Sequence, residues 1–416
     1  MKADKILINI GQLFCPLDEN TPLKGEMLKE ANIIENAYLA IKDGLILDFG
    51  NGIYKHLIDE ATQILNLKGM VVTPGLIDAH THFVFGGSRE HEFALKLNGV
   101  EYLEILEMGG GILNTVNSTR NTSFDDLYDK AERVLDNMLK YGVTTVEGKS
   151  GYGLDFETEM KQLEVMKKLD ENHTLTVVPT FMAAHAIPPE YKEKRDDYIN
   201  LIIDQMLPYV ANNKLAKYQD VFLESGVFTK EESLRILLAG NKYGLRARVH
   251  ADEVKSLGGI DAAVEANAIS CEHLMATTDE DMYKMAQSGI IANLLPATTF
   301  SLMKDSYARA KDFLKYDNAI TICSDFNPGS CPSENLQMAM FLAVYKMKLT
   351  PIQVLNAVTI NAAYSVGLGK EIGSITKSKN ADLTIFNVPN IDYIFYNFGV
   401  NNVHSIFKSG NLIKWH

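Results

Sequence analysis

The sequence has little cysteine, and its cysteines are not paired in a motif. Four occur in 416 residues, and none lies in a Cys-x-x-Cys pair; they are Cys15, Cys271, Cys323 and Cys331. This spacing is typical of thiols that stay reduced, in the core or near a site, in a cytoplasmic protein.

Long apolar runs are also absent. No stretch approaches the roughly 20 apolar residues that a membrane-spanning helix requires. The first ten residues include Asp4 and alternate polar with apolar side chains as a strand does, unlike a signal peptide. We therefore expect no membrane partner and a cytoplasmic location.

The chain has no block of basic residues. Lys and Arg number 40 against 53 Asp and Glu, which gives a net charge of −13. This balance argues against a nucleic-acid partner and leaves a small-molecule substrate as the expected one. A hydrophobic content of 46% over 416 residues is enough for a barrel of about 250 to 300 residues with an additional domain.

Short β-rich segments alternate with amphipathic helical patterns through the middle of the chain. We predict strands at residues 76–82, 142–147, 175–181, 218–224, 245–250, 268–271, 290–294 and 319–324. We predict helices at 124–141, 157–169, 198–212 and 230–243, the last ending at Gly244. Eight strands alternating with helices predict an α/β fold, a (β/α)₈ TIM barrel.

The two ends of the chain have a different pattern. Strand-like segments lie at 5–10, 37–42 and 45–49, and again at 381–386 and 404–408, with turn signals such as Asp43-Gly44 between them. We expect both ends to form one small β-sandwich domain beside the barrel. The predicted division is 1–70 and 371–416 for this domain and 71–370 for the barrel.

Ligand-type residues lie at the predicted strand ends, where a TIM barrel places its active site. His80 and His82 stand two residues apart, so a strand would point both the same way, and His250 and Asp325 end two later strands. Three imidazoles and a carboxylate suit one Zn²⁺ or similar divalent ion with a position left for water. Such an ion would lower the pKa of that water toward roughly 7.

Other polar residues near these ends have candidate roles in proton transfer. Glu253 fits a general acid/base beside the metal, with Asp252 as the alternative. His273 fits a residue that orients the water or stabilises an oxyanion, and a further metal ligand is the other reading. Lys149 is either an ordinary cation or a carbamate bridging two metals; one set of ligands favours the mononuclear site.

Three loops carry candidate substrate-binding residues. Arg89 follows the His-x-His segment beside two glycines and can clamp a carboxylate with its fork. Tyr152 lies between Gly151 and Gly153, where we expect an exposed, functional aromatic ring. The segment 327–330 after Asp325 offers amide and hydroxyl groups near the metal.

The motifs resemble those of the amidohydrolase superfamily, and within it the imidazolonepropionases, over nearly the whole chain. The matching segments are 74–82, 84–90, 146–153, 179–185, 250–253 and 325–332, together with His273. Two departures are visible: Ala183-Ala184 replaces a usual Gly before Ala-His, and Pro296-Ala297 replaces a usual Pro-Gly. Both exchange one small residue for another and leave the ligand positions intact.

The resemblance implies a reaction and a set of roles. The reaction is hydrolysis of 4-imidazolone-5-propanoate to N-formimino-L-glutamate. The implied metal is Zn²⁺ or Fe³⁺, bound by His80, His82, His250 and Asp325. The implied imidazolone-binding residues are Arg89, Tyr152, His185 and Glu253, and the implied product contacts are Asn327, Gly329 and Ser330.

Two other functions compete with this one. A nucleobase deaminase of the same superfamily also carries His-x-x-Glu after its fifth strand, but it binds a neutral ring and has less need of Arg89. A metal-free barrel acting as a scaffold typically loses ligands, and all are present here. The expected assembly is a homodimer, the common default for an oligomer.

Overall fold

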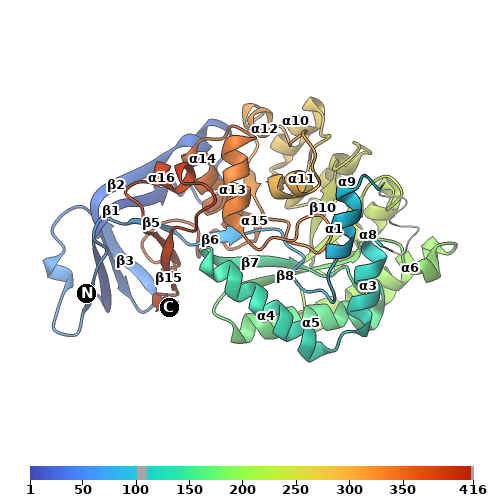
Figure 1. The fold of residues 1–416 in the computed structure, drawn as a ribbon, viewed down its shortest axis with the longest axis horizontal. Helices are drawn as coiled ribbons and strands as arrows, with labels where there is room; N and C mark the ends of the chain where they lie inside the picture. Colours follow the sequence, from blue (N-terminus) through green and yellow to red (C-terminus); the bar gives the residue numbers. More distant parts are fainter. Residues whose placement is uncertain (101–109, 414–416) are drawn as a thin grey trace.

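The computed structural model describes residues 1–100 and 110–413. Two sheets organise the chain: a parallel barrel, and a smaller sheet built from both chain ends (Figure 1). The α/β fold predicted from the sequence is confirmed. Within these residues, no helix has both the length and the apolar character needed to cross a membrane.

Eight parallel strands form the barrel, and each of the eight predicted strands corresponds to one of them. Strands that are hydrogen-bonded neighbours in the barrel are also consecutive in the sequence. They are β6 (Leu76–Asp78), β7 (Val143–Lys149), β8 (Thr176–Ala184), β9 (Tyr218–Leu223), β10 (Arg246–Ala251), β11 (Ser270–His273), β12 (Ile291–Leu294) and β13 (Ile320–Ile322).

The seam between the first and last strands is closed just beyond their ends. Asp325 N donates to His80 O at 3.1 Å, and His82 N donates to Phe326 O at 2.8 Å. The strand predicted at 76–82 therefore ends early, at Asp78, because the next residues bond across this seam instead of continuing the ladder. Both histidines still face the barrel interior.

Helices cover the outside of the barrel (Figure 1). Three of the four predicted helices are confirmed within three residues at either end: α4 (Phe124–Lys140), α5 (Phe156–Asn172) and α8 (Lys230–Lys242). The helix α8 begins with a capping box between Thr229 and Glu232, and Gly244 after it has φ of 84°.

The helix predicted at 198–212 is divided into three pieces. These are α6 (Arg195–Leu201), a π-helical turn (Ile202–Met206) and α7 (Leu207–Asn212). Pro208 lies at the start of α7 and has no backbone N–H, so the regular helical bonding pattern is interrupted there.

The remaining helices of the described residues are short. They are α1 (Glu90–Leu97), α3 (Ile112–Asn121), α9 (Gly259–Glu265), α10 (Asp279–Ser288), α11 (Pro296–Ser301), α12 (Ala310–Lys315), α13 (Leu336–Tyr345), α14 (Pro351–Ala357), α15 (Ile360–Ser365) and α16 (Ile391–Tyr396). Three short 3₁₀ turns are Gly25–Lys29, Lys55–Leu57 and Pro189–Tyr191.

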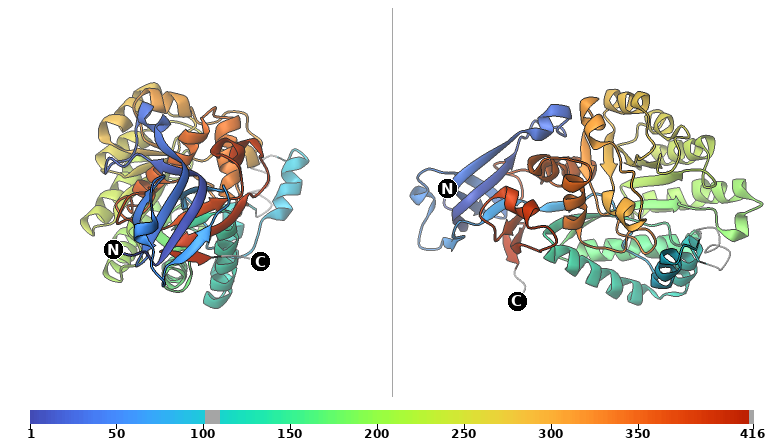
Figure 2. Two further views of the ribbon diagram at one scale, coloured as in Figure 1. Left: turned by 90° about the vertical axis from the view of Figure 1, so that its left-hand side faces the viewer. Right: turned by 45° about the horizontal axis from the view of Figure 1, so that its top comes forward.

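The chain-end sheet joins both ends of the protein, as Figure 2 shows for the blue and red strands. Its strand β1 is bent at a bulge between Leu7 and Ile10, and it pairs with β4 along one half and β5 along the other. The predicted sandwich is thus joined by hydrogen bonds into one sheet of eight strands. They are β1 (Lys5–Pro16), β2 (Ala31–Lys42), β3 (Leu45–Gly50), β4 (Gln63–Asn66), β5 (Val71–Pro74), β14 (Leu383–Phe386), β15 (Val403–Lys408) and β16 (Asn411–Ile413).

The two sheets meet where β5 leads into β6. Gly75 between them has no room for a side chain, because a Cβ there would be 2.2 Å from Thr144 Oγ1. Across the same junction, Thr384 Oγ1 of β14 donates to Gly142 O at 2.7 Å. Strand β5 lies in the range predicted for the barrel, which begins at residue 71, but it pairs with β1 and β14 of the chain-end sheet. The predicted domain boundaries stay a prediction.

The hydroxyl of Thr384 should contribute measurably to the junction of the two sheets. Thr384 is fully buried, so Thr384→Val removes a hydrogen bond with little change of shape. We expect a loss of about 1 kcal/mol in the free energy of unfolding, measured by urea denaturation. Thr384→Ser, which keeps the hydroxyl, is the control. If Thr384→Val unfolds at the same urea concentration as wild type, the hydroxyl does not stabilise the junction.

Candidate metal centre

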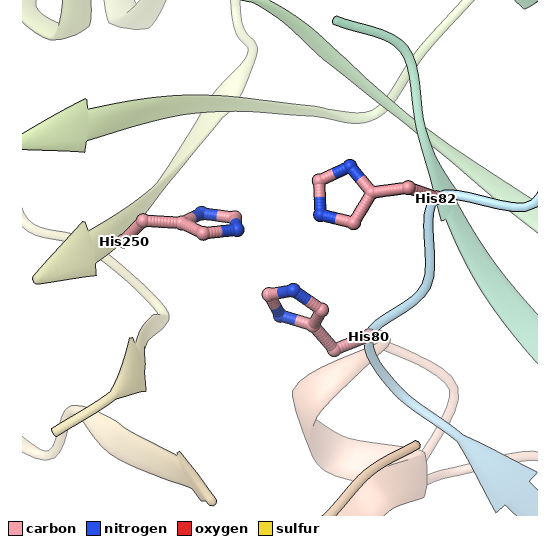
Figure 3. A group of neighbouring side chains, drawn as sticks. All are labelled: His80, His82 and His250. Carbon is pink, nitrogen blue, oxygen red and sulfur yellow. The ribbon is translucent and has the colours of Figure 1, made fainter. Parts of the chain in front are cut away.

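Three histidine rings converge at the carboxyl end of the barrel (Figure 3). His80 and His82 follow β6, and His250 lies near the end of β10. The ring of His80 is 4.7 Å from that of His250 and 5.4 Å from that of His82, measured between centroids. All three are buried.

Asp325 completes this group from the segment after β13. Its Oδ1 is 3.4 Å from His80 Nε2 and 3.7 Å from His82 Nε2. Its Oδ2 accepts a hydrogen bond from Thr298 at 2.6 Å, which fixes the carboxylate plane. Asp325 adopts φ of 55°, in the left-handed region that Asp and Asn enter more readily than most other L residues. The four residues predicted as ligands therefore lie together.

The ring nitrogens fit a metal ion. Among the described residues, Nε2 of His80 and Nε2 of His250 have no hydrogen-bond partner although they are buried, and the His82 nitrogen nearest Asp325 is Nε2. Burial, and then the positive charge of Lys149, lowers the pKa of His80; burial and His185 lower the pKa of His82. Neutral imidazoles with unused lone pairs beside a carboxylate are the donors that Zn²⁺ and similar ions take.

A carboxylate stands behind each of two of these histidines. His80 Nδ1 donates to Glu272 Oε2 at 2.7 Å, which leaves its Nε2 as the lone-pair nitrogen. His250 Nδ1 is 3.0 Å from Asp220 Oδ1. Burial lowers the pKa of His250 and Asp220 raises it, and the net direction is upward. Sequence reasoning missed both carboxylates.

Each carboxylate is paired in turn with a buried cation. Lys149 Nζ lies 2.9 Å from Asp220 Oδ2 and 2.9 Å from Glu147 Oε1. Arg248 lies 3.5 Å from Glu272 and 4.0 Å from Glu147. All five side chains are fully buried, and together they form what we term the interior ion network: Glu147, Lys149, Asp220, Arg248 and Glu272.

The ion pairs of Lys149 distinguish its two candidate roles, an ordinary cation or a carbamate that bridges two metals. Burial opposes its charge, but the carboxylates of Asp220 and Glu147 raise its pKa above the usual value. A carbamate forms on a neutral amine, and this amine is held as an ammonium between two carboxylates. The geometry therefore favours the mononuclear site.

A signal for the network was present in the sequence. Charged or polar residues lie two apart in or directly after predicted buried strands, as in Arg248 and His250 or in Glu147 and Lys149. Such residues share one face of a strand, and in a barrel that face is the interior.

Glu253 and His273 lie on neighbouring strand ends beside the ligands. Glu253 Oε2 is 3.8 Å from His273 Nε2, and the Glu253 side chain is 15% exposed. Asp252 points elsewhere, because its Oδ2 accepts from Thr277 at 2.9 Å. Glu224, the residue after β9, holds this loop by accepting from Val254 N at 2.9 Å. Of the two acids, Glu253 is the one at the site.

Tyr152 and His185 form an aromatic group with the ligands. The ring of His185 stacks on His82 at 5.0 Å and lies 5.3 Å from Tyr152. The prediction that Tyr152 is exposed is wrong, since it is 3% exposed. Glu159 accepts from the backbone N–H of Gly151 and Gly153 at 3.1 and 2.8 Å, and this draws the loop inward.

Arg89 is almost buried and is paired with a residue that the sequence did not single out. Its Nε and Nη2 donate to the two carboxylate oxygens of Glu92 at 3.0 and 2.7 Å. Its Nη1 lies against Gly329, where a Cβ would be only 2.1 Å away. Arg89 thus spans from α1 to the segment after Asp325.

The side chain of Asn327 organises its own loop. Its Oδ1 accepts from Gly329 N at 2.8 Å and Ser330 N at 2.7 Å, and its Nδ2 donates to Asp325 O at 2.7 Å. These bonds fix the loop next to Asp325. Direct contact of this loop with a product stays a prediction.

Comparison with known proteins identifies relatives of the whole chain. A model of the amidohydrolase family matches residues 71–413. The imidazolonepropionase of Streptococcus sanguinis (strain SK36) is 54% identical over 414 residues, which cover 99% of this chain and 98% of the relative. The imidazolonepropionase of Streptococcus pyogenes serotype M1 is 53% identical over 413 residues, with the same coverage.

Solved structures share the fold at low sequence identity. Guanine deaminase of E. coli has a TM-score of 0.73 at 15% identity, covering 99% of both chains. Ochratoxinase of A. niger has a TM-score of 0.71 at 19% identity, covering 100% of this chain and 96% of its own. These likenesses concern the barrel with its attached sheet.

The carboxylate behind His80 should matter for metal retention. Glu272→Gln keeps the shape but removes the charge that orients the imidazole. We expect metal affinity to fall about 10- to 100-fold, measured by competition with a chelator on the loaded protein. Asp382→Asn, which breaks a buried ion pair with Lys408 in the other sheet, is the control and should retain the metal. Equal affinity in wild type and Glu272→Gln would contradict the role.

Proposed function

Since the chain belongs to the amidohydrolase family, we propose that it opens the cyclic amide of 4-imidazolone-5-propanoate to give N-formimino-L-glutamate. The observation that carries this proposal is the full-length similarity to imidazolonepropionases, at more than half of all positions. The site agrees with it, since the convergent histidines suit metal-assisted hydrolysis and Arg89 suits a substrate with a carboxylate.

The metal proposed for this site is Zn²⁺ or Fe³⁺, held by His80, His82, His250 and Asp325. When bound, such an ion polarises a carbonyl and lowers the pKa of a coordinated water to roughly 7. The chain prepares the ligands for it: burial keeps His80 and His82 neutral, and Glu272 fixes the tautomer of His80.

Glu253 is proposed to move the proton. Attack of water on the ring carbonyl forms a C–O bond, and the ring C–N bond then breaks. The water's proton passes to the Glu253 carboxylate and from there to the departing ring nitrogen. His273, whose Nε2 is 3.8 Å from Glu253, is proposed to orient the water or to stabilise negative charge on the carbonyl oxygen.

The substrate is proposed to lie between the aromatic group and Arg89. Tyr152 and His185 offer ring faces for the imidazolone, next to His82. Arg89 binds the propanoate by charge-assisted hydrogen bonds. Asn327, Gly329 and Ser330 form the adjoining wall and contact the product.

Loss of the carboxyl group of Glu253 should lower turnover. In Glu253→Gln we expect kcat to fall about 10²- to 10⁴-fold, measured by the absorbance of imidazolone-propanoate, with metal content unchanged. The comparison variant is Asp252→Asn, because Asp252 is turned away from the site; its kcat should fall far less. If the wild type instead releases ammonia from guanine or cytosine and leaves imidazolone-propanoate intact, the deaminase alternative replaces this function.

Removal of the guanidinium should weaken substrate binding. Arg89→Met is expected to raise KM about 10- to 100-fold, as loss of a charge-assisted hydrogen bond predicts. The matched control is Arg195→Met, which breaks an equivalent bidentate pair with Glu232 between α6 and α8. An unchanged KM in Arg89→Met would remove this arginine from the substrate site.

A further inference from the structure

Glu92 is a buried carboxylate next to the substrate side of the site, and the reaction outlined above gives it no role. It lies in the first turn of α1 and is 1% exposed. It accepts from Arg89 Nε at 3.0 Å and Nη2 at 2.7 Å, and from the backbone N–H of Gly111 at 2.8 Å. A buried carboxylate is costly unless it is paired in this manner, which indicates a specific role for the contact.

The pairing determines which part of Arg89 meets a ligand. A guanidinium has two edges that hold a carboxylate with two parallel hydrogen bonds. Glu92 takes the edge made by Nε and Nη2. A second carboxylate bound in the same bidentate manner therefore takes the other edge, made by Nη1 and the second hydrogen of Nη2.

The Nη1 atom of that second edge lies beside the loop after β13. A Cβ on Gly329 would be 2.1 Å from Nη1, so the backbone of this loop lies directly against the guanidinium. The same loop begins at Asp325, a predicted metal ligand, and Asn327 ties the two together by donating to Asp325 O at 2.7 Å. The guanidinium edge made by Nη1 and Nη2 is thus held at a fixed position relative to Asp325.

We propose that Glu92 is a positioning residue that makes the site selective for a ring bearing a carboxylate. It aligns Arg89 so that the guanidinium edge made by Nη1 and Nη2 receives that carboxylate. The carboxylate is then held at a set distance from the predicted metal ligands. The pair of Arg89 and Glu92 is neutral overall, so the preference comes from the direction of the hydrogen bonds more than from net charge. This inference rests on the proposed function.

The test compares Glu92→Gln with wild type in the metal-loaded enzyme. An amide in place of the carboxylate has one acceptor oxygen and a donor NH₂ that opposes the guanidinium donors, so Arg89 loses its alignment. We expect KM for imidazolone-propanoate to rise about tenfold, with kcat within about twofold. Competitive inhibition by imidazole-4-propanoate should weaken similarly, and inhibition by 4-ethylimidazole, which has no carboxylate, should not change.

A double-mutant cycle shows whether Glu92 acts through Arg89. In the Arg89→Met background, Glu92→Gln should cause no further rise in KM, because the group that it aligns is gone. Additive rises in KM would overturn the proposal. Glu232→Gln, which breaks the similar bidentate pair with Arg195, should leave KM unchanged and so controls for a general loss of stability.

Gly329→Ala tests the same contact if Glu92→Gln fails to fold. Its methyl group would displace Nη1, so KM for the carboxylate-bearing ring should rise while inhibition by 4-ethylimidazole stays constant. If Gly329→Ala weakens the binding of imidazolone-propanoate and of 4-ethylimidazole equally, the proposal is contradicted. If wild type turns over imidazolone-propanoate and these variants keep its KM, only the inference about Glu92 fails. If wild type does not turn it over, the proposed function itself fails.

Discussion

The interior ion network is the interaction on which the site depends. Three carboxylates and two cations are fully buried in the barrel, where each isolated charge would be strongly unfavourable. They persist because each cation contacts two carboxylates, and two of those carboxylates hold the imidazoles of His80 and His250. The network therefore carries one net negative charge beneath a place suited to a cation. The same five side chains thus orient two of the histidine ligands and supply a negative charge that favours a cation.

A similar arrangement recurs on the substrate side. Arg89 is fixed by Glu92, and Tyr152 is drawn inward because Glu159 binds the backbone on both sides of it. Glu224 does the same for the loop that carries Glu253. In each case a buried acid binds a polar side chain or a backbone N–H of a loop at the site. The residues that would touch a substrate thus sit on loops that buried carboxylates fix by hydrogen bonds.

Much of the fold and of the site could be predicted from the sequence because both rest on local patterns. Alternating strands and helices indicate a parallel barrel, and His80, His82, His250 and Asp325 mark the strand ends that meet in it. Pairings between distant segments could not be predicted in this way. Arg248 meets Glu272 only because β10 and β11 pair with Arg248 opposite Ser270, a register that neither strand specifies alone. The inward turn of Tyr152 depends on Glu159 in the next helix, and the break in the helix near Pro208 depends on a single missing N–H.

The seam of the barrel gives the predicted metal ligands a second significance. His80 and Asp325 lie on its two sides, and near them Ser324 N donates to Asp78 across 246 positions of the chain. Contacts between residues so far apart in the chain form only after the entropy cost of loop closure has been met. An ion bound by both residues would link the two sides of the seam, so its binding free energy would also add to the stability of the folded chain. Metal binding and closure of the barrel would then be thermodynamically coupled.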